Sequence, residues 1–418
     1  MLRTTLAQRV SLVWQGRRAL LRGIVAVLAV LLVLSESQGA MAASFADHSV
    51  LASGKWRKVK VTKSGIYQLS AQTLSSMGFA NPQNVRIYGA GGHQLSYKVG
   101  SDSRDDLTLV PAIHRTDGSI IFYAEGPDGR TVTSGVFVPD FNCFSKESYY
   151  YVTENSGVSD NVAVAAAPSA EPSVTLTQYD SHAYWAQRTT NIDMTGREWV
   201  GEHFSSSSKK ASLSLTLPHA DGATITAYTR FATYIRSQAK SYTIALNGTT
   251  IKEGTLDLPS STWSWMPANT VGKLENVAKG NQVSVDIQVG LSRSDEYVYL
   301  SYVSLTSQAD LELGSASQVD FRSLKQRSTS GTVRYVVANT SSSLRVWDVT
   351  NATSISQMTL QSATGGQSFV ATGGSLCEYV AFDENGSFNE PTYCGTVDNH
   401  DLHAHGSVNY LVVTQPQF

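Results

Sequence analysis

The chain has 418 residues and a formal net charge of −2, and 41% of its residues are hydrophobic. This length allows roughly two to four domains of about 150 residues each, and the apolar content excludes a disordered or fibrous protein. The slightly acidic charge is unsuited to nucleic acid, whose phosphates favour a basic protein surface.

The N-terminal segment, residues 1–42, differs from the rest of the chain. It has five arginines, then an apolar run over residues 24–34, then the small residues Ala40 and Ala42. An apolar run of this length is too short to span a bilayer and is typical of a signal peptide. We expect cleavage after Ala42 and export of the remaining chain. A retained N-terminal membrane anchor is the alternative.

The mature chain is expected to be more acidic than the whole. Cleavage removes five of the 32 basic and one of the 34 acidic residues, which leaves 27 and 33 and a net charge of −6. No later segment is long and apolar enough to be a transmembrane segment. We therefore expect an exported protein with no membrane-spanning part and no affinity for nucleic acid.

Residues 44–160 are predicted to form an N-terminal β-rich domain. Alternating residues around a Gly-bearing turn predict a hairpin over 58–69, and Ser70 and Gly78 are placed to begin and end a two-turn helix. Further strands are expected at 84–89, 119–126 and 148–153. Residues 161–205 are interpreted as a linker with a short helical segment, because their first part is small and Pro-bearing.

Residues 206–310 are predicted to form an antiparallel β-sandwich. Apolar and polar residues alternate over 211–217, 282–289 and 297–305, and Gly, Asn and Ser turns separate these runs. Residues 311–399 are expected to form a third β-rich module, with strands near 343–350 and 377–383. The apolar run 408–414, within 400–418, is expected to be the first strand of a truncated α/β (caspase-like) domain. The predicted fold class is thus mainly β, with two or three antiparallel modules before that strand.

Seven stretches together resemble a known family, in the same order along the chain. They are "LASGKWRKVKVTKSGIYQLSAQTLSSMGF", "NVRIYGAGG", "IIFYAEGP", "FSKESYYYVT", "GREWVGEHF", "VWDVT" and "EYVAFD". They resemble the N-terminal part of the PorU-type sortases of the type IX secretion system, which belong to the gingipain-like cysteine peptidases. The closing "VDNHDLHAHGSVNYLVVTQPQF" is similar to the start of that family's peptidase domain.

The resemblance implies a function that this sequence does not carry by itself. In that family the catalytic His and the nucleophilic Cys lie beyond the first strand of the peptidase domain, and nothing here matches either position. We therefore expect no catalytic or cofactor-binding residue, and no enzyme in the chain as given. The resemblance also implies secretion-system proteins and secreted cargo as partners. It implies a location in the periplasm, outer membrane or cell surface of a Gram-negative bacterium, where cargo loses a C-terminal signal domain and is attached to lipopolysaccharide.

Four other features of the sequence are candidate sites. Trp263 and Trp265 are predicted to share one face of a strand, where they form either core or a binding platform. If they are exposed, the alternative function is a non-enzymatic secreted sandwich that binds glycan or a surface protein. Cys377 and Cys394 are a possible disulfide, since an exported chain can oxidise, and Cys143 would remain free.

Two loops carry possible ligands for metal ions. Asp102, Asp105 and Asp106 offer the hard oxygen atoms that calcium prefers, but the loop lacks the pattern of an EF-hand, so a solvated turn is the preferred interpretation. His400, His403 and His405 lie in a polar loop without the tight spacing of zinc ligands. We predict no metal site from either loop.

Overall fold

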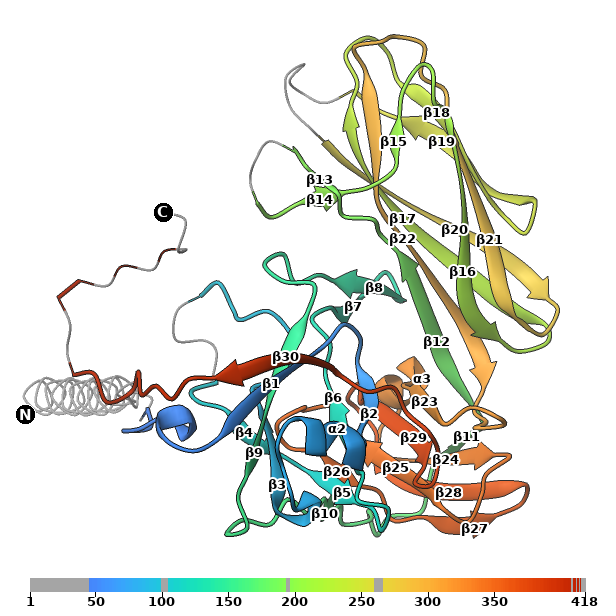
Figure 1. Ribbon diagram of the computed structural model, residues 1–418. Coiled ribbons are helices and arrows are strands. Elements are labelled where there is room, and N and C mark those ends of the chain that lie inside the picture. Colours follow the sequence, from blue (N-terminus) through green and yellow to red (C-terminus); the bar gives the residue numbers. More distant parts are fainter. Residues whose placement is uncertain are drawn as a thin grey trace, which may run out of the picture.

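The computed structural model describes residues 45–98, 104–192, 196–258, 266–406, 409, 410, 412 and 414. The protein consists mainly of antiparallel β-sheets, as predicted. Figure 1 shows two bodies, which we name the base (residues 45–177 and 311–397) and the sandwich (residues 178–310). Among the described residues, no helix is both long and apolar enough to cross a membrane.

The N-terminal part of the base, the N-terminal module, contains a five-stranded sheet, a three-stranded sheet and a hairpin. The first sheet has the order β30 (Thr392–Val397), β1 (Trp56–Val61), β9 (Ser148–Glu154), β3 (Val85–Gly89) and β4 (Thr108–Val110). The second has the order β2 (Gly65–Leu69), β6 (Ile120–Ala124) and β5 (Ala112–His114), and the hairpin consists of β7 (Gly129–Thr133) and β8 (Val136–Asp140). A short helix, η1 (Val50–Ala52), precedes β1, and two others, α2 (Ala71–Ser76) and η2 (Pro82–Asn84), lie between β2 and β3.

The remainder of the base, the C-terminal module, has two sheets and one helix, α3 (Leu324–Ser328). One sheet has the order β10 (Ala163–Val164), β26 (Ser356–Gln357), β25 (Leu344–Asp348), β29 (Tyr379–Asp383) and β23 (Gln318–Phe321). The other has the order β11 (Val174–Leu176), β24 (Thr332–Ala338), β28 (Gly366–Thr372) and β27 (Gln361–Ala363). The pairs β10–β26 and β11–β24 are parallel.

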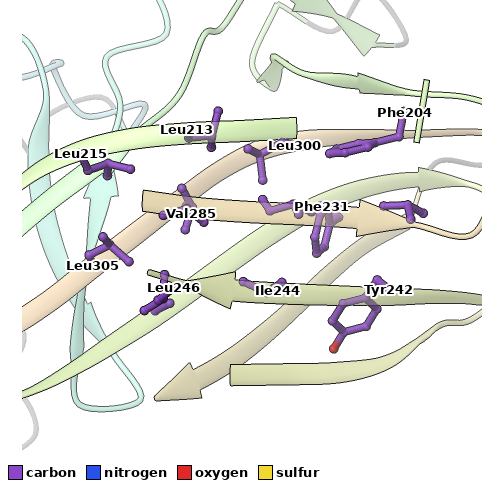
Figure 2. Packing of buried hydrophobic residues seen from close by; sticks show 14 of the residues in the cluster. Phe204, Leu213, Leu215, Phe231, Tyr242, Ile244, Leu246, Val285, Leu300 and Leu305 are labelled. Carbon is purple, nitrogen blue, oxygen red and sulfur yellow. The ribbon is translucent and has the colours of Figure 1, made fainter. Parts of the chain in front are cut away.

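The sandwich packs two antiparallel sheets face to face. One has the order β12 (Gln178–Trp185), β22 (Tyr297–Asp310), β17 (Ala223–Tyr234) and β20 (Met266–Val277), and β15 (His203–Phe204) also pairs with β22. The other has the order β16 (Lys210–His219), β21 (Gly280–Val289), β18 (Lys240–Leu246) and β19 (Thr249–Leu256). A small ribbon of β13 (Thr190–Asn191) and β14 (Trp199–Val200) lies beside them. Figure 2 shows how alternate residues of both sheets meet in one core, including Leu213, Phe231, Ile244, Val285 and Leu300.

The base is one unit although its two modules come from distant parts of the sequence. Ile66, Ile121 and Tyr123 of the N-terminal module pack in a single core with Trp347 and Phe382 of the C-terminal module. In addition, the chain returns after β29 and places β30 beside β1 as a strand of the N-terminal sheet. The predicted third module is therefore fused to the first by a shared core and a shared sheet.

A side-chain amide joins the two modules at a strand edge. The backbone N–H of Ile66 in β2 donates to Gln318 Oε1 (2.7 Å), and Gln318 Nε2 donates to the carbonyl oxygen of Ile66 (3.0 Å). Gln318 thereby satisfies both polar groups that an additional strand would otherwise pair. This contact connects the edge of β2 to β23.

Most predicted elements are confirmed, whereas the predicted hairpin over residues 58–69 is wrong. β1 pairs with β9 and β30, and β2 pairs with β6, so residues 62–64 form a corner between two sheets. The same apolar alternation serves a strand in any antiparallel sheet, which is why it did not reveal the partner. Helix α2 is confirmed: Ser70 Oγ accepts from the N–H of Thr73, and Gly78 follows with φ +87°.

The segment 161–205 is not a simple linker, because it contains the strands β10 to β15. β12 pairs with β22 along its whole length, so the chain enters and leaves the sandwich on two adjacent strands. Of the predicted helical part, the described residues show a 3-10 conformation at Ile192, and residues 193–195 lie outside the described part of the chain. Of the predicted strand over residues 408–414, the structure describes residues 409, 410, 412 and 414. Of those described there, none is in a strand, and Tyr410 and Val412 are exposed. A strand is stable only with a hydrogen-bonded neighbour, and the described residues supply none at this point.

Candidate functional site at the junction of the modules

A polar cavity of about 520 Å³ lies where the sandwich meets both modules of the base. Each neighbouring element contributes a side chain: Lys63 from the corner after β1, Arg130 from β7, His182 from β12, Thr216 from β16 and Asp320 from β23. Pockets of this size and position, at domain interfaces, are typical of ligand sites. This cavity could not be predicted from the sequence, because its lining residues share no motif.

An ion-pair network forms one wall of the cavity and crosses between the modules. Arg130 of the N-terminal module lies 3.2 Å from Glu378 and 3.5 Å from Asp320, both in the C-terminal module. The buried guanidinium of Arg322 binds the same two carboxylates. Burial alone would lower the pKa of Arg322, but Glu378 and Asp320 raise it above its usual value, so the cation is retained.

His182 connects the sandwich to the hairpin β7–β8 through a hydrogen-bond relay. Ser304 Oγ donates to the carbonyl oxygen of Phe137 (2.7 Å), so it accepts from His182 Nε2 (2.8 Å), which therefore carries the proton. Burial, helped by the cations Arg130 and Arg322, lowers the pKa of His182 to about 3. The imidazole is consequently neutral at physiological pH and acts as a fixed donor.

The hairpin β7–β8 also packs directly on the outer face of the sandwich. Val136 and Val138 contact Tyr228 and Tyr302, and the N–H of Phe137 donates to Thr306 Oγ1 (3.2 Å). With the relay and the ion-pair network, this contact fixes the sandwich relative to the base. The arrangement supplies donors, fixed charges and a defined orientation of the modules.

Of the residues considered as sites from the sequence, the structure brings together the aspartate loop and the histidine loop, where His403 lies 3.7 Å from Asp105. Trp263, Trp265 and Ala42 lie outside the described residues, as does Asp102. Asp105 and Asp106 accept hydrogen bonds from the backbone N–H groups of Ala46 and Val50 (2.6 Å each). These bonds attach the first described residues to the loop that carries the two aspartates. In the part of the chain that the structure describes, no group of three or more His, Cys, Asp or Glu side chains is placed to hold a metal ion.

The histidine loop is likewise used for contacts with the N-terminal segment. Asp401 accepts from the N–H of Ser49 (2.9 Å) and lies 2.7 Å from His48, while His403 lies 3.7 Å from Asp105. His400 Nδ1 is 3.0 Å from the carbonyl oxygen of Asp398. These contacts join residues 46–50 to 398–404.

The disulfide that we considered possible between Cys377 and Cys394 is not present in the structure, in which all three cysteines are free thiols. Cys394 is exposed on β30, in the sheet of the N-terminal module. Cys377 is half-buried and packs against the core of the C-terminal module. The two thiols therefore lie in different places in the base, Cys377 in the loop before β29 and Cys394 on β30.

We expect three alkylatable thiols in the denatured chain without a reductant. In the folded protein Cys394 should react first and Cys377 last, because burial raises the pKa of Cys377 and lowers its thiolate fraction at neutral pH. Timed iodoacetamide labelling followed by mass spectrometry of the Cys-containing peptides checks both statements. If only Cys143 is labelled in the denatured, unreduced chain, Cys377 and Cys394 form a disulfide and the expectation is wrong.

The chain matches no protein-family model and no curated protein. Its fold is similar to the crystal structure of dimeric latent PorU from Porphyromonas gingivalis, with a TM-score of 0.78 and 22% sequence identity over 87% of this chain. The match covers 35% of the PorU chain, so this protein corresponds to about a third of that length. At this identity the likeness shows the fold, which is a PorU-like assembly of β modules.

Small carbohydrate-binding modules match a limited part of the chain. A family 35 module from an environmental isolate has a TM-score of 0.21 and 16% identity, and covers 32% of this chain and 97% of its own. The C-terminal family 6 module of the laminarinase LamC from Zobellia galactanivorans has a TM-score of 0.19 and 13% identity, and covers 31% of this chain and 98% of its own. These scores are too low to support an argument about function.

Proposed function

We propose that this chain is the N-terminal, non-catalytic region of a type IX secretion sortase, a gingipain-like cysteine peptidase that processes secreted cargo and attaches it at the outer membrane. The observation that carries the proposal is the PorU-like fold over 87% of the chain. The family's ordered sequence stretches, which fall on β1 to α2, β3, β6, β9, β14–β15, β25 and β29, support it. The cysteine chemistry would belong to a peptidase domain that follows these modules.

In this proposal the base and the sandwich position the peptidase domain and its partners. The two bodies are held by the hairpin β7–β8, the His182 relay and the Arg130 network, so their relative orientation is defined. A defined orientation is what a docking platform requires, because ordering loose modules on binding would cost affinity. The exported location, at the periplasmic side or outer surface of the outer membrane, is part of the same proposal.

The test has two steps in the source bacterium. The reading frame beyond the codon of Phe418 is expected to encode a domain with a His and a Cys in peptidase context. Deletion of residues 45–397 from the full-length gene should then leave cargo with its C-terminal signal domain uncleaved, as seen by immunoblot and intact mass. A Lys60→Met variant, altered at an exposed ion pair, is the matched control. Normal cargo processing by the deletion variant would refute the proposal.

A further inference from the structure

The junction cavity of about 520 Å³ carries one cation that no carboxylate balances. The other charged side chains on its wall are each paired with an opposite charge, in the pairs Arg130–Glu378, Asp128–Arg188 and Asp320–Arg322. Lys63, from the corner after β1, is exposed and makes no ion pair with any residue that the structure describes. A ligand with a single anionic group would balance its charge.

His182 adds a second requirement, because it offers a hydrogen-bond acceptor in a positive field. Burial lowers the pKa of His182, and the cations Arg130 and Arg322 lower it further, by more than Asp320 raises it. The Nε2–H group of His182 donates to Ser304 Oγ (2.8 Å), so Nδ1 keeps its lone pair and can only accept. Nδ1 makes no hydrogen bond within the described part of the chain. A carboxylate cannot supply the donor that Nδ1 requires, whereas a hydroxyl group can.

Hydroxyl groups from the base and from the sandwich line the same cavity. Those of Thr62 and Ser214 make no hydrogen bond to another residue in the described ranges. Thr216 Oγ1 accepts from Gln282 Nε2 (2.9 Å) and so retains its own proton for a further bond. A hydroxyl both donates and accepts, so these groups match the hydroxyls of a ligand in either direction. Trp185 adds apolar surface to the wall.

We propose that the junction cavity binds a sugar acid, a ring that carries several hydroxyl groups and one carboxylate. The carboxylate would pair with Lys63, and a hydroxyl would donate to His182 Nδ1. The remaining hydroxyls would exchange hydrogen bonds with Thr62 and Ser214, and the C–H face of the ring would pack against Trp185. The volume of about 520 Å³ is within the range of small-molecule sites. The inference goes beyond the proposed function, because it uses no peptidase chemistry.

Three simpler ligands are less favourable. A small carboxylate without hydroxyls could neutralise Lys63 but would leave Nδ1 of His182 without a donor. It would also face Asp320, whose side chain is 61% exposed, without a hydroxyl to bind it. A neutral sugar could satisfy both acceptors but would leave the charge of Lys63 unbalanced. A zwitterionic amino acid would bring its ammonium group towards the cations Arg130 and Arg322.

Ligand-observed NMR titration of the full chain tests the inference with six probes. Three are the hexuronates glucuronate, galacturonate and mannuronate, and the others are glucose, acetate and alanine. At low salt, at least one hexuronate should bind at least about tenfold more tightly than glucose, acetate and alanine. Lys63→Met should weaken its binding about tenfold and leave that of glucose unchanged. Lys60→Met, altered at an exposed ion pair outside the cavity wall, is the matched control and should bind as the native chain does.

A trimer of the best hexuronate distinguishes the two sources of such a ligand. Tighter binding of the trimer than of the single sugar identifies a polysaccharide, because further rings then contact the protein beyond the cavity. Equal binding identifies a free sugar acid. Both results support the site.

Two results would overturn the inference. One is that no hexuronate binds more tightly than glucose or acetate. The other is equal binding of the best hexuronate to the native chain and to Lys63→Met, whose exposed side chain can be removed without unfolding the protein. If hexuronates fail to bind but deletion of residues 45–397 still blocks cargo processing, this inference is wrong and the proposed function stands.

Discussion

Replacement of Lys240 by methionine is expected to destabilise the sandwich by about 3–5 kcal/mol, the usual cost of removing one partner of a buried ion pair. Lys240 Nζ lies 2.8 Å from Glu296 Oε2, and the two side chains are 2% and 0% exposed. Glu296 Oε1 also accepts from the N–H groups of Arg236 and Ser237 at 2.9 and 2.8 Å. The variant would retain a buried carboxylate without its countercharge. Thermal unfolding at neutral pH, followed by circular dichroism, measures the loss.

The pH dependence of this loss identifies its cause. Burial would raise the pKa of Glu296, but Lys240, Ser237 and Arg236 together lower it below the ordinary value of 4.5. In the native protein the stability contributed by Glu296 is therefore present above pH 4.5 and is lost as the pH falls through the folded-state pKa. Without Lys240, burial of Glu296 dominates and its folded-state pKa should rise. Protonation of Glu296 at low pH should then remove part of the stability loss of the variant. The difference between variant and native protein should narrow below about pH 4.

Two further variants separate the buried charge from other effects. Lys60→Met removes the same side chain from an exposed pair with Glu147, in which both side chains are 31% exposed, and should leave the unfolding midpoint almost unchanged. The double variant Lys240→Met with Glu296→Gln removes both charges and should be more stable than Lys240→Met alone. Equal losses for Lys240→Met and Lys60→Met would contradict the expectation.

The strands of this protein were predictable because each one follows a local pattern. The alternation over 211–217 and 282–289 became β16 and β21, which pair with each other through Leu213 and Val285. Ser70 and Gly78 identified α2 by the chemistry of helix ends. Such signals depend only on neighbours in sequence, so they survive any tertiary arrangement.

The partners of the strands were not predictable, and this is where the domain boundaries differ. β30 pairs with β1 from the other end of the chain, and the sequence of β30 carries no mark of that pairing. Residues 58–69 were expected to pair as a hairpin, but β1 and β2 find partners in two different sheets. Both errors have the same origin, since alternation fixes which face of a strand is buried and leaves its neighbour open.

The candidate site was invisible in the sequence for a related reason. Arg130, His182 and Asp320 stand alone among unrelated neighbours, and they form a site only where three modules meet. The tempting sequence clusters, such as Asp105 with Asp106, proved to hold chain segments together. In this protein the clustered aspartates bind the backbone of a neighbouring chain segment, whereas isolated residues make the contacts between modules.

Replacement of Trp347 by alanine is expected to destabilise both modules of the base at once, by about 3–5 kcal/mol. Trp347 is fully buried in the core that joins the modules, and its ring contacts Phe382 edge-on at a centroid distance of 4.9 Å. The indole N–H has no hydrogen-bond partner within the described residues, so the side chain contributes through packing alone. The cavity left behind would lie in the core that Ile66 and Tyr123 of the N-terminal module share with Phe382.

Hydrogen exchange distinguishes a fused base from two independent modules. In Trp347→Ala, exchange should accelerate together in β6 of the N-terminal module and in β25 and β29 of the C-terminal module, because one core and the sheet containing β30 connect them. Phe231→Ala is the matched control: this fully buried aromatic residue lies on β17 in the core of the sandwich, outside the shared core, and its removal should leave exchange in β6, β25 and β29 unchanged. Faster exchange confined to β25 and β29 would show that the modules unfold separately. In that case the shared core would only hold two self-sufficient modules in contact.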